Sequence, residues 1–548
     1  MPRFLSLLTA LVVAFSLSAR ELEPPKADEK WITFDTDGFR FISSASPRAT
    51  QDIARDILRM RAALAKVTKL EVRTERPTRV YIFPSERRFA TYREAALDVK
   101  NDAVTGVFVT SSSGGNFILL DSSAESVDRV VYHELTHQFV QNTSAGLPLW
   151  FNEGLAEYYS TFQTVGDQTL IGRAVQDHVR WLRFQFQSLI PLRELFATTS
   201  SSPTYTEGDR HGIFYAQSWA LVHYLMTDPA RRTQLGRFLT LLDGGKSVDE
   251  AFSGAFGMKF AELEQALRTY ILGVSFQYNS YALADIAIDE LPEPAAMPHD
   301  EVLHQLGYLL AHSRAVHAGT AERFFKEALA ANPRNAGVYA ELGRLYESAG
   351  RSAEAGTAYE KAVQLGTSDA AVYLLAGNSV LRRDPARARA YFQQATKLDP
   401  ESAPAWSGLG STYVSGEGDR AAGIAALEKS LALAPGNDEA TFYLAQLYAH
   451  ASRFEEARKL ARAVLARTKD EPMQRHLTTM LAQVDRFEAQ NRALSAINDA
   501  VTKANSGRYQ EALVIIDRVL PTIEDAELQQ QTRALREQVA SQVKPKKK

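Results

Sequence analysis

The chain has 548 residues, of which 45% are hydrophobic and 23% charged, with a formal net charge of -3 and no cysteine. This length exceeds that of one typical domain, and the near-neutral charge argues against a dedicated nucleic-acid-binding protein. The lack of cysteine excludes both disulfides and lipid attachment to a cysteine.

The N-terminus has the features of a secretory signal peptide. Met1-Pro-Arg3 is a short basic segment, and the apolar run from Phe4 to Leu17 is too short to span a membrane. We expect residues 1–19 to be removed, which leaves a periplasmic or secreted bacterial protein without a membrane span. The alternative is a segment retained as an anchor. Residues 20–30 are polar and predict a leader.

Residues 31–285 carry the pattern of an α+β domain with a mixed sheet and helices. Alternating apolar residues on either side of Asp37-Gly38 predict a β-hairpin. Further strands are predicted at 79–83, 104–109 and 117–121, and helices at 50–69, 181–196, 213–227 and 260–271.

Two short motifs lie close together in the middle of this domain. His133, Glu134 and His137 form the pattern His-Glu-x-x-His, and Asn152-Glu153-Gly154 follows. Residues four apart share one face of a helix, so His133 and His137 can direct both imidazoles at one ion. A catalytic zinc site takes three protein ligands, and Glu153 is the best third ligand. The motifs therefore predict a Zn2+ site, and the alternative is a helix whose charges face solvent.

Two further carboxylates belong to the predicted site. Glu134 lies between the histidines, where it can take a proton from water that zinc has made more acidic, so we predict it as the general base. Glu157 lies one turn beyond Glu153 and can hydrogen-bond the free ring nitrogen of a zinc-binding histidine. The helix of the first motif is predicted to begin near Ser122, which forms a capping-box pattern with Glu125.

These motifs carry a resemblance to a known family. His133-Glu-Leu-Thr-His137, followed after fifteen residues by Glu153 within Trp150-Phe-Asn-Glu-Gly-Leu-Ala156, resembles the gluzincin metallopeptidases, especially the peptidase MA-like group related to the M1 aminopeptidases. The resemblance covers about residues 30–285. It implies that His133, His137 and Glu153 hold zinc, that Glu134 is the base, and that Glu157 matches the acidic position beside the zinc site in thermolysin-like members.

The chain departs from the M1 pattern in two respects. The interval from His137 to Glu153 is shorter, and Gly114-Gly115-Asn116 lacks the acidic residue of the segment that captures a substrate's free amine. Endopeptidase and exopeptidase action therefore both stay open. Tyr215 resembles the family's catalytic tyrosine, which stabilises the oxyanion. His211 is the competing candidate for this role. The alternative for Tyr215 is a purely structural place at the side of a core helix.

The C-terminal part is repetitive. Residues 286–299 contain three prolines and predict a linker. Beyond it Pro333, Gly366, Pro400 and Pro435 lie 33, 34 and 35 residues apart, which is the period of tetratricopeptide (TPR) repeats. Residues 300–470 resemble about five TPR repeats in an all-α solenoid. We expect residues 471–540 to form a divergent TPR-like helical cap and residues 541–548 a basic tail.

A TPR array presents a concave groove that binds extended peptides or helices. We therefore expect a protein partner in this groove in addition to a peptide or protein substrate; the alternative is an array that only stacks on the peptidase. The combined prediction is an exported zinc metallopeptidase with a C-terminal TPR domain. The rival is a TPR scaffold or adaptor of the cell envelope that carries a zinc-binding pseudo-peptidase domain with little or no turnover. The presence of all three ligands and Glu134 favours the enzyme.

Overall fold

The computed structural model describes residues 22–543 apart from 69–77, 98–104, 112–114, 125–128, 141–146, 207, 314–316 and 415–418. The predicted signal peptide and most of the basic tail lie outside these residues. The chain divides into two compact units, Met1–Pro333 and Arg334–Lys548. None of the described helices is long and apolar enough to cross a membrane.

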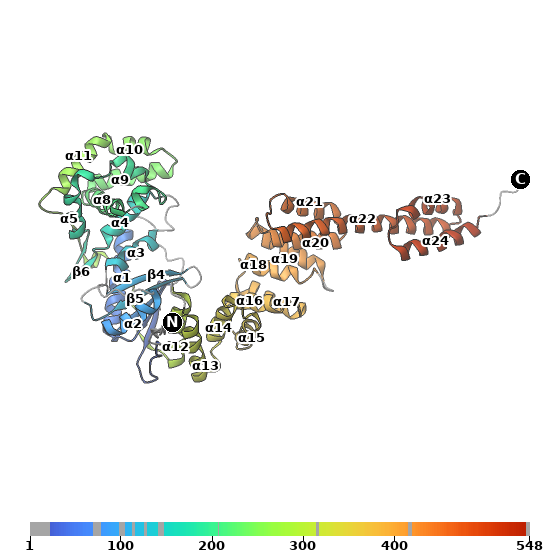
Figure 1. Ribbon diagram of the computed structural model, residues 1–548, viewed down its shortest axis with the longest axis horizontal. Coiled ribbons are helices and arrows are strands. Elements are labelled where there is room, and N and C mark those ends of the chain that lie inside the picture. Colours follow the sequence, from blue (N-terminus) through green and yellow to red (C-terminus); the bar gives the residue numbers. More distant parts are fainter. Residues whose placement is uncertain are drawn as a thin grey trace, which may run out of the picture. The chain divides into compact units, whose positions relative to one another are not determined.

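The first unit is built on a mixed six-stranded sheet with the strand order β4-β5-β3-β2-β1-β9. Figure 1 labels two of its strands, β4 and β5. β2 and β5 run parallel to β3, and the other neighbouring pairs are antiparallel. The predicted hairpin is confirmed, because Asp37 (φ 45°) and Gly38 (φ 80°) form the two-residue turn between β1 and β2. The strands are β1 (Ile32–Thr36), β2 (Phe39–Ser43), β3 (Thr78–Phe83), β4 (Gly106–Ser111), β5 (Gly115–Asp121) and β9 (Ala295–Ala296).

Among the described residues, the first unit has thirteen helices, some of which pack on this sheet. They are α1 (Pro47–Thr68), α2 (Glu86–Leu97), α3 (Arg129–Val140), α4 (Leu149–Tyr159), α5 (Gln176–Phe184), α6 (Leu192–Ala197), α7 (Pro203–Thr206), α8 (Gly208–Met226), α9 (Pro229–Asp243), α10 (Val248–Phe256), α11 (Phe260–Ile271), α12 (His299–His312) and α13 (Ala318–Ala331). Short 3-10 turns occur at Phe186–Ser188 and Leu283–Asp285. A small antiparallel sheet joins β6 (Gln163–Val165), β7 (Gln168–Ile171) and β8 (Asn279–Ala282).

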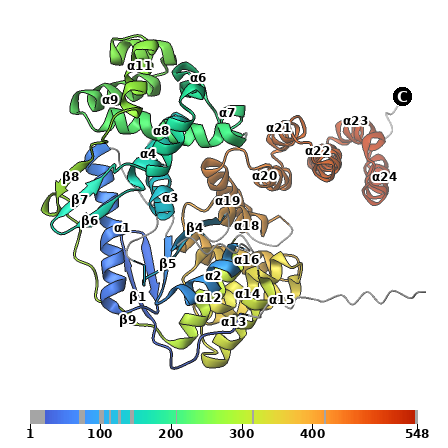
Figure 2. The same cartoon turned by 60° about the vertical axis from the view of Figure 1, so that its left-hand side comes forward.

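The two faces of the large sheet carry different helices, because successive side chains of a strand point to opposite faces. Val80 and Ile82 of β3 share one apolar core with residues of α1 and α3. On the opposite face Phe83 stacks on Tyr92 of α2, with ring centroids 4.8 Å apart. In Figure 2, α1 lies on one side of the strands, and α2 and α12 lie on the other. The helix with the histidine motif therefore belongs to the α1 side.

Two predicted helix boundaries differ from the structure. The helix predicted over 181–196 is interrupted, since α5 ends at Phe184 and Pro191 stands at the N-cap of α6. The helix with the first motif is described from Arg129, whereas residues 122–124 form a turn. Ser122 Oγ donates to the carbonyl oxygen of Phe83, 3.0 Å away, so this hydroxyl ties the turn to β3. Glu125, its predicted capping partner, lies outside the described residues.

The region predicted as repeats consists of helical hairpins with a common packing device. A glycine on the first helix faces a large side chain on the second, so a Cβ on Gly343 would lie 2.3 Å from the ring of Tyr359. The same pairing joins Gly307 with Phe325, Gly377 with Phe392, and Gly410 with Leu427. The helices after α13 are α14 (Ala336–Ser348), α15 (Ser352–Gln364), α16 (Ala370–Val380), α17 (Pro385–Leu398), α18 (Ala403–Ser411), α19 (Arg420–Leu433), α20 (Asp438–His450) and α21 (Phe454–Leu465).

The region predicted as a cap contains one long helix and two shorter ones. α22 (Glu471–Asn505) continues for 35 residues, packs on α21, and then packs on α23 (Tyr509–Val519). A 3-10 turn at Leu520–Thr522 leads into α24 (Ala526–Ser541). The second unit is therefore helical throughout its described length, and the first is a mixed sheet with helices, as the fold class predicts.

The first helical hairpin, α12 with α13, belongs to the first unit and lies against its sheet. The Tyr81 hydroxyl donates to the carbonyl oxygen of Gln305 at 2.8 Å, and Arg79 Nε donates to Gln305 Oε1 at 3.2 Å. The Arg79 guanidinium also lies 3.8 Å from the ring centroid of Tyr308, which packs on Phe117 of β5. Just before α12, in the predicted linker, β9 pairs with β1. The sheet and the first hairpin are thus one packed structure.

Candidate metal centre

α3 presents both histidines of the first motif on one side. Its apolar residues Val131, Leu135 and Phe139 are fully buried in the core. His133 and His137 lie at the margin of this buried face, where 12% and 15% of their side chains remain exposed. Amphipathic spacing therefore fixes which way the imidazoles point.

α4 brings Glu153 opposite these histidines. Pro148 precedes the helix, and Trp150, Leu155 and Tyr159 bury its other faces. Gly154 lies against α8 so closely that a Cβ there would be 2.4 Å from the carbonyl oxygen of Ser218. The glycine beside the third predicted ligand thus permits the contact between α4 and α8.

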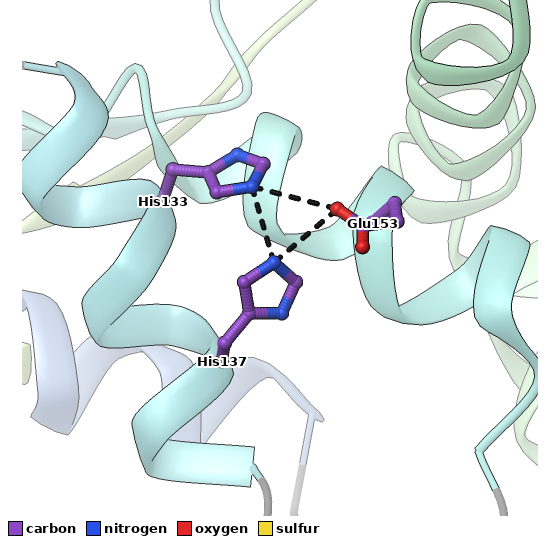
Figure 3. Close-up of side chains that lie close together, drawn as sticks. All are labelled: His133, His137 and Glu153. Atoms are coloured by element: carbon purple, nitrogen blue, oxygen red, sulfur yellow. Dashed lines mark hydrogen bonds and ion pairs between the residues drawn. The ribbon is translucent and has the colours of Figure 1, made fainter. Parts of the chain in front are cut away.

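The three predicted ligands converge. His133 Nε2 and His137 Nε2 are 3.1 Å apart, and Glu153 Oε2 lies 3.5 Å from the first and 3.3 Å from the second. One ligand atom of each residue lies within 4.8 Å of the others, and Figure 3 shows the three side chains pointing at a common centre.

The outer nitrogens of both imidazoles face oxygen atoms. His137 Nδ1 lies 3.2 Å from Asn152 Oδ1, and His133 Nδ1 lies 3.3 Å from Glu157 Oε1. A proton on each Nδ1 satisfies these contacts and directs the lone pair of each Nε2 inward. Glu153 Oε2 is buried, and no residue that the structure describes donates a hydrogen bond to it. Two nitrogen lone pairs and a carboxylate oxygen facing one another suit a metal cation.

The electrostatics of the group show how strongly it attracts positive charge. Burial alone would lower the pKa of His133, but the carboxylates of Glu153 and Glu157 outweigh it and raise this pKa to about 9. Burial would likewise raise the pKa of Glu153, yet its contacts with both histidines lower it to about 2. A proton or a metal cation at this point balances the charge of the carboxylates.

Glu157 lies behind the histidines and is held by three groups. Its carboxylate contacts His133, lies 3.1 Å from His178 Nε2, and accepts a hydrogen bond of 3.1 Å from Arg129. Burial favours the neutral carboxyl, but the contacts with His133 and His178 hold the pKa of Glu157 well below its usual range. Glu157 therefore stays charged and orients His133. The sequence predicts this same contact between Glu157 and a histidine of the motif.

Tyr215 of α8 and Tyr205 of α7 stand on the other side of Glu153. The Tyr205 hydroxyl donates to Glu153 Oε1 at 3.3 Å and lies 3.2 Å from the Tyr215 hydroxyl. The Tyr215 ring is 6.3 Å from the His133 ring between centroids. Burial, Tyr205 and Glu153 all raise the pKa of Tyr215 above its ordinary value, so its hydroxyl is a proton donor at neutral pH.

Two predicted residues remain, Glu134 and His211, and the structure describes the side chain of only the first. Glu134 is half-buried on α3 between the histidines, near enough to Tyr205 to help raise the pKa of that tyrosine. His211 belongs to α8, but its side chain lies outside the described residues.

Three residues that contact the group were missed by the sequence analysis: Tyr205, His178 and Arg129. Arg129 precedes the first motif by four residues, one helical turn before His133, so helical spacing alone was a usable signal. Tyr205 and His178 come from segments with no motif of their own, and only the fold brings them to Glu153 and Glu157.

Comparison with protein families divides the chain in the same way. A family model of the Peptidase MA superfamily matches residues 60–273. Two models of tetratricopeptide repeats match residues 317–378 with 415–481, and residues 381–417. None of the curated proteins compared matches the chain.

The solved structures similar to part of the chain include two TPR proteins and MamA. YrrB, a TPR protein with an unusual peptide-binding site, is 20% identical, with 32% of this chain and 91% of YrrB covered at a TM-score of 0.30. MamA is 28% identical over 27% of this chain and 87% of its own, with a TM-score of 0.25. TTC0263, a thermophilic TPR protein of Thermus thermophilus, is 21% identical, with 33% of this chain and 99% of TTC0263 covered at a TM-score of 0.25. At such TM-scores the assignment of the repeats rests on the family models.

Proposed function

Because residues 60–273 match the Peptidase MA superfamily and TPR repeats follow within residues 317–481, we propose that this chain is an exported zinc metallopeptidase whose repeats bind protein or peptide. The observation that carries the proposal is the convergence of His133, His137 and Glu153 within 4.8 Å, with Glu134 between the histidines on the same helix. Three ligands of this kind leave a fourth position of a tetrahedral zinc site open for chemistry.

The residues around this centre have separable tasks in peptide hydrolysis. A zinc ion supplies Lewis acidity toward water and toward the carbonyl group of the scissile bond. Glu134 takes a proton from the attacking water and returns it to the leaving amine. Tyr215 donates a hydrogen bond to the oxyanion that develops on the carbonyl oxygen. Asn152 and Glu157 hold the two imidazoles in the tautomer that directs Nε2 inward.

The sheet beside the centre offers a place for an extended peptide. β4 is the terminal strand of the large sheet, pairs on one side with β5, and packs against α3. No described strand pairs with its outer edge. A peptide that adds to such an edge through main-chain hydrogen bonds is held without regard to its sequence, which suits a peptidase.

The repeats provide a second binding surface. In the second unit, Tyr339, Leu342 and Tyr346 of α14 line a hollow of about 610 Å³ together with residues of α15, including Lys361. Aromatic rings beside a rim of acidic (Glu354, Glu360) and basic (Lys361) side chains are suited to the side chains of a protein partner. We assign to the repeats the recruitment of a protein or peptide.

The decisive comparison is between the wild type and Glu134→Gln, with Glu293→Gln, an exposed residue before α12, as the control. We expect all three proteins to bind one zinc per chain, measured by elemental analysis. In a peptide-library cleavage assay, Glu134→Gln should lose about 10²- to 10⁴-fold of the rate, because a general base contributes that much. The control should cleave like the wild type.

Other outcomes have distinct meanings. Zinc in every variant with cleavage by none would favour a TPR scaffold with a zinc-binding pseudo-peptidase domain. No zinc in the wild type would contradict the metal centre itself. Fractionation of expressing cells tests export: we expect the protein in the periplasm or medium with a new N-terminus near residue 20, and a cytoplasmic, uncleaved chain would contradict that part.

A further inference from the structure

A chain of two hydroxyl groups leads from Tyr215 to the outer oxygen of Glu153. Tyr205 OH lies 3.3 Å from Glu153 Oε1 and 3.2 Å from Tyr215 OH. The opposite oxygen of the same carboxylate, Oε2, faces His133 and His137. Tyr205 therefore contacts the predicted ligand through the carboxylate oxygen that does not face the histidines.

The direction of the protons along this chain follows from the chemistry of the groups. A carboxylate oxygen only accepts hydrogen bonds, so the Tyr205 hydroxyl donates to Glu153 Oε1. A hydroxyl has one proton, so in the substrate-free protein the Tyr205 oxygen accepts from Tyr215 in the second contact. The same Tyr215 proton turns to the oxyanion only when a substrate is bound. Tyr205 thus joins the carboxylate and the Tyr215 hydroxyl in a single directed chain.

The fold holds the Tyr205 ring in place independently of these hydrogen bonds. The ring is nearly parallel to that of Tyr215, with centroids 6.1 Å apart, and edge-on to that of Phe214 at 5.4 Å. The preceding residue, Thr204, is buried and donates to Glu194 Oε1 at 2.7 Å, which fastens α7 to α6. A phenylalanine at position 205 would keep the ring contacts and remove only the hydroxyl.

We propose that Tyr205 is a positioning residue of the metal centre, which fixes the Glu153 carboxylate with Oε2 toward the histidines and holds the Tyr215 hydroxyl beside it. This inference rests on the proposed function. Groups that orient a metal ligand from outside typically change metal affinity by 10- to 100-fold when removed. Tyr215 also lies near Glu153, but the hydroxyl seen to donate to Glu153 Oε1 is that of Tyr205, so we assign Tyr215 mainly to the reaction and less to the hold on the metal.

The test compares the full-length Tyr205→Phe and Tyr215→Phe proteins with the wild type and with Tyr278→Phe, a tyrosine that is 52% exposed. Zinc affinity is measured by competition with a chromophoric chelator, and peptide cleavage by initial rates. We expect zinc affinity about 10-fold or more weaker for Tyr205→Phe and within about threefold of the wild type for Tyr215→Phe and the control. At saturating zinc both site variants should show a lower kcat with little change in KM.

The affinity arm separates this inference from the proposed function. If the wild type binds zinc and Tyr205→Phe binds it within about twofold as tightly, the positioning role is wrong even if peptides are cleaved. If Tyr215→Phe weakens zinc as much as Tyr205→Phe, the assignment of the hold on Glu153 to Tyr205 is wrong. A wild type that binds zinc without cleaving peptides would contradict the peptidase proposal and leave the affinity test standing. No zinc in the wild type would overturn both.

Discussion

At Gly154 a missing side chain sets the distance between two helices of the candidate metal centre. The sequence shows this glycine only as part of a motif with Glu153. The structure supplies a physical reason, since a Cβ would meet the backbone of α8 at Ser218 and the side chain of Val222 at 2.6 Å. A backbone carbonyl cannot rotate away as a side chain can, so α4 and α8 must separate to admit a methyl group.

We predict that Gly154→Ala destabilises the first unit by about 1–3 kcal/mol, the usual range for overpacking a core. Gly236→Ala in α9 is the matched control, because a Cβ there meets nothing within 4 Å. Alanine is favoured over glycine inside a helix by up to about 1 kcal/mol, so the control should be neutral or stabilising. Urea unfolding monitored by tryptophan fluorescence measures both, and equal effects of the two substitutions would refute the packing argument.

Residue patterns alone predicted that His133, His137, Glu153 and Glu157 lie together, because each lies on a helix next to another member of the group. His133 and His137 are one turn apart on α3, and Glu153 and Glu157 are one turn apart on α4. Tyr205 and His178 escaped prediction because their approach depends on how α5, α7 and α8 pack. Local periodicity contains no information about such long-range contacts.

At the scale of elements, His223 ties three segments of the first unit together. It lies buried on α8, where Nε2 donates to the carbonyl oxygen of Gly172 after β7 and Nδ1 accepts from the Tyr270 hydroxyl of α11, both at 2.7 Å. Tyr158 of α4 also packs on its ring. Both ring nitrogens are used by the neutral imidazole, and burial lowers the pKa of His223 to about 4.

This lowered pKa predicts a loss of stability in acid. The unfolded chain takes up a proton at His223 near pH 6.5, whereas the folded chain resists until about pH 4, so stability is lost as the pH falls between these values. From about pH 7 to about pH 5 the free energy of unfolding falls by about 2 kcal/mol from this source.

His223→Gln removes this titration, so it should reduce the loss of unfolding free energy between pH 7 and pH 5 by about the same amount. The control His476→Gln, at an exposed histidine, should leave that loss unchanged. Trp219, whose ring is 5.1 Å from that of His223, reports the unfolding. The same acid loss in wild type and His223→Gln would rule out this source.

The sequence separates the peptidase and the repeats more sharply than the structure does. Residues 286–299 read as a linker because of their prolines, yet Ala295 and Ala296 pair with β1. The repeat period predicts that the repeats begin at residue 300. It gives no sign that the first of these helices, α12, lies on the sheet. A helix can satisfy a repeat pattern on one face and contact a different domain with residues such as Gln305 and Tyr308 on another.

At the scale of the whole molecule, this packing predicts where the chain can be cut. The compact first unit ends at Pro333, so a chain ending there should fold and bind zinc. A chain ending at residue 298 keeps the whole predicted peptidase domain but loses α12, which exposes Tyr81 and Phe117, both fully buried in the intact protein. Exposing an aromatic side chain costs about 1.5–3 kcal/mol, and two such losses are large against a typical stability of about 5–15 kcal/mol.

Three chains without the signal segment, ending at residues 298, 333 and 366, test this point by thermal unfolding and zinc content. We expect the unfolding midpoint of the first unit to rise by several degrees between 298 and 333, because the first hairpin then covers the sheet, and to stay unchanged between 333 and 366. The chain ending at 366 controls for length, since it adds one hairpin that belongs to the second unit. Equal midpoints for 298 and 333 would show that the domain boundary follows the proline-rich segment, as the sequence predicts, and that α12 contributes nothing measurable to the fold around the metal centre.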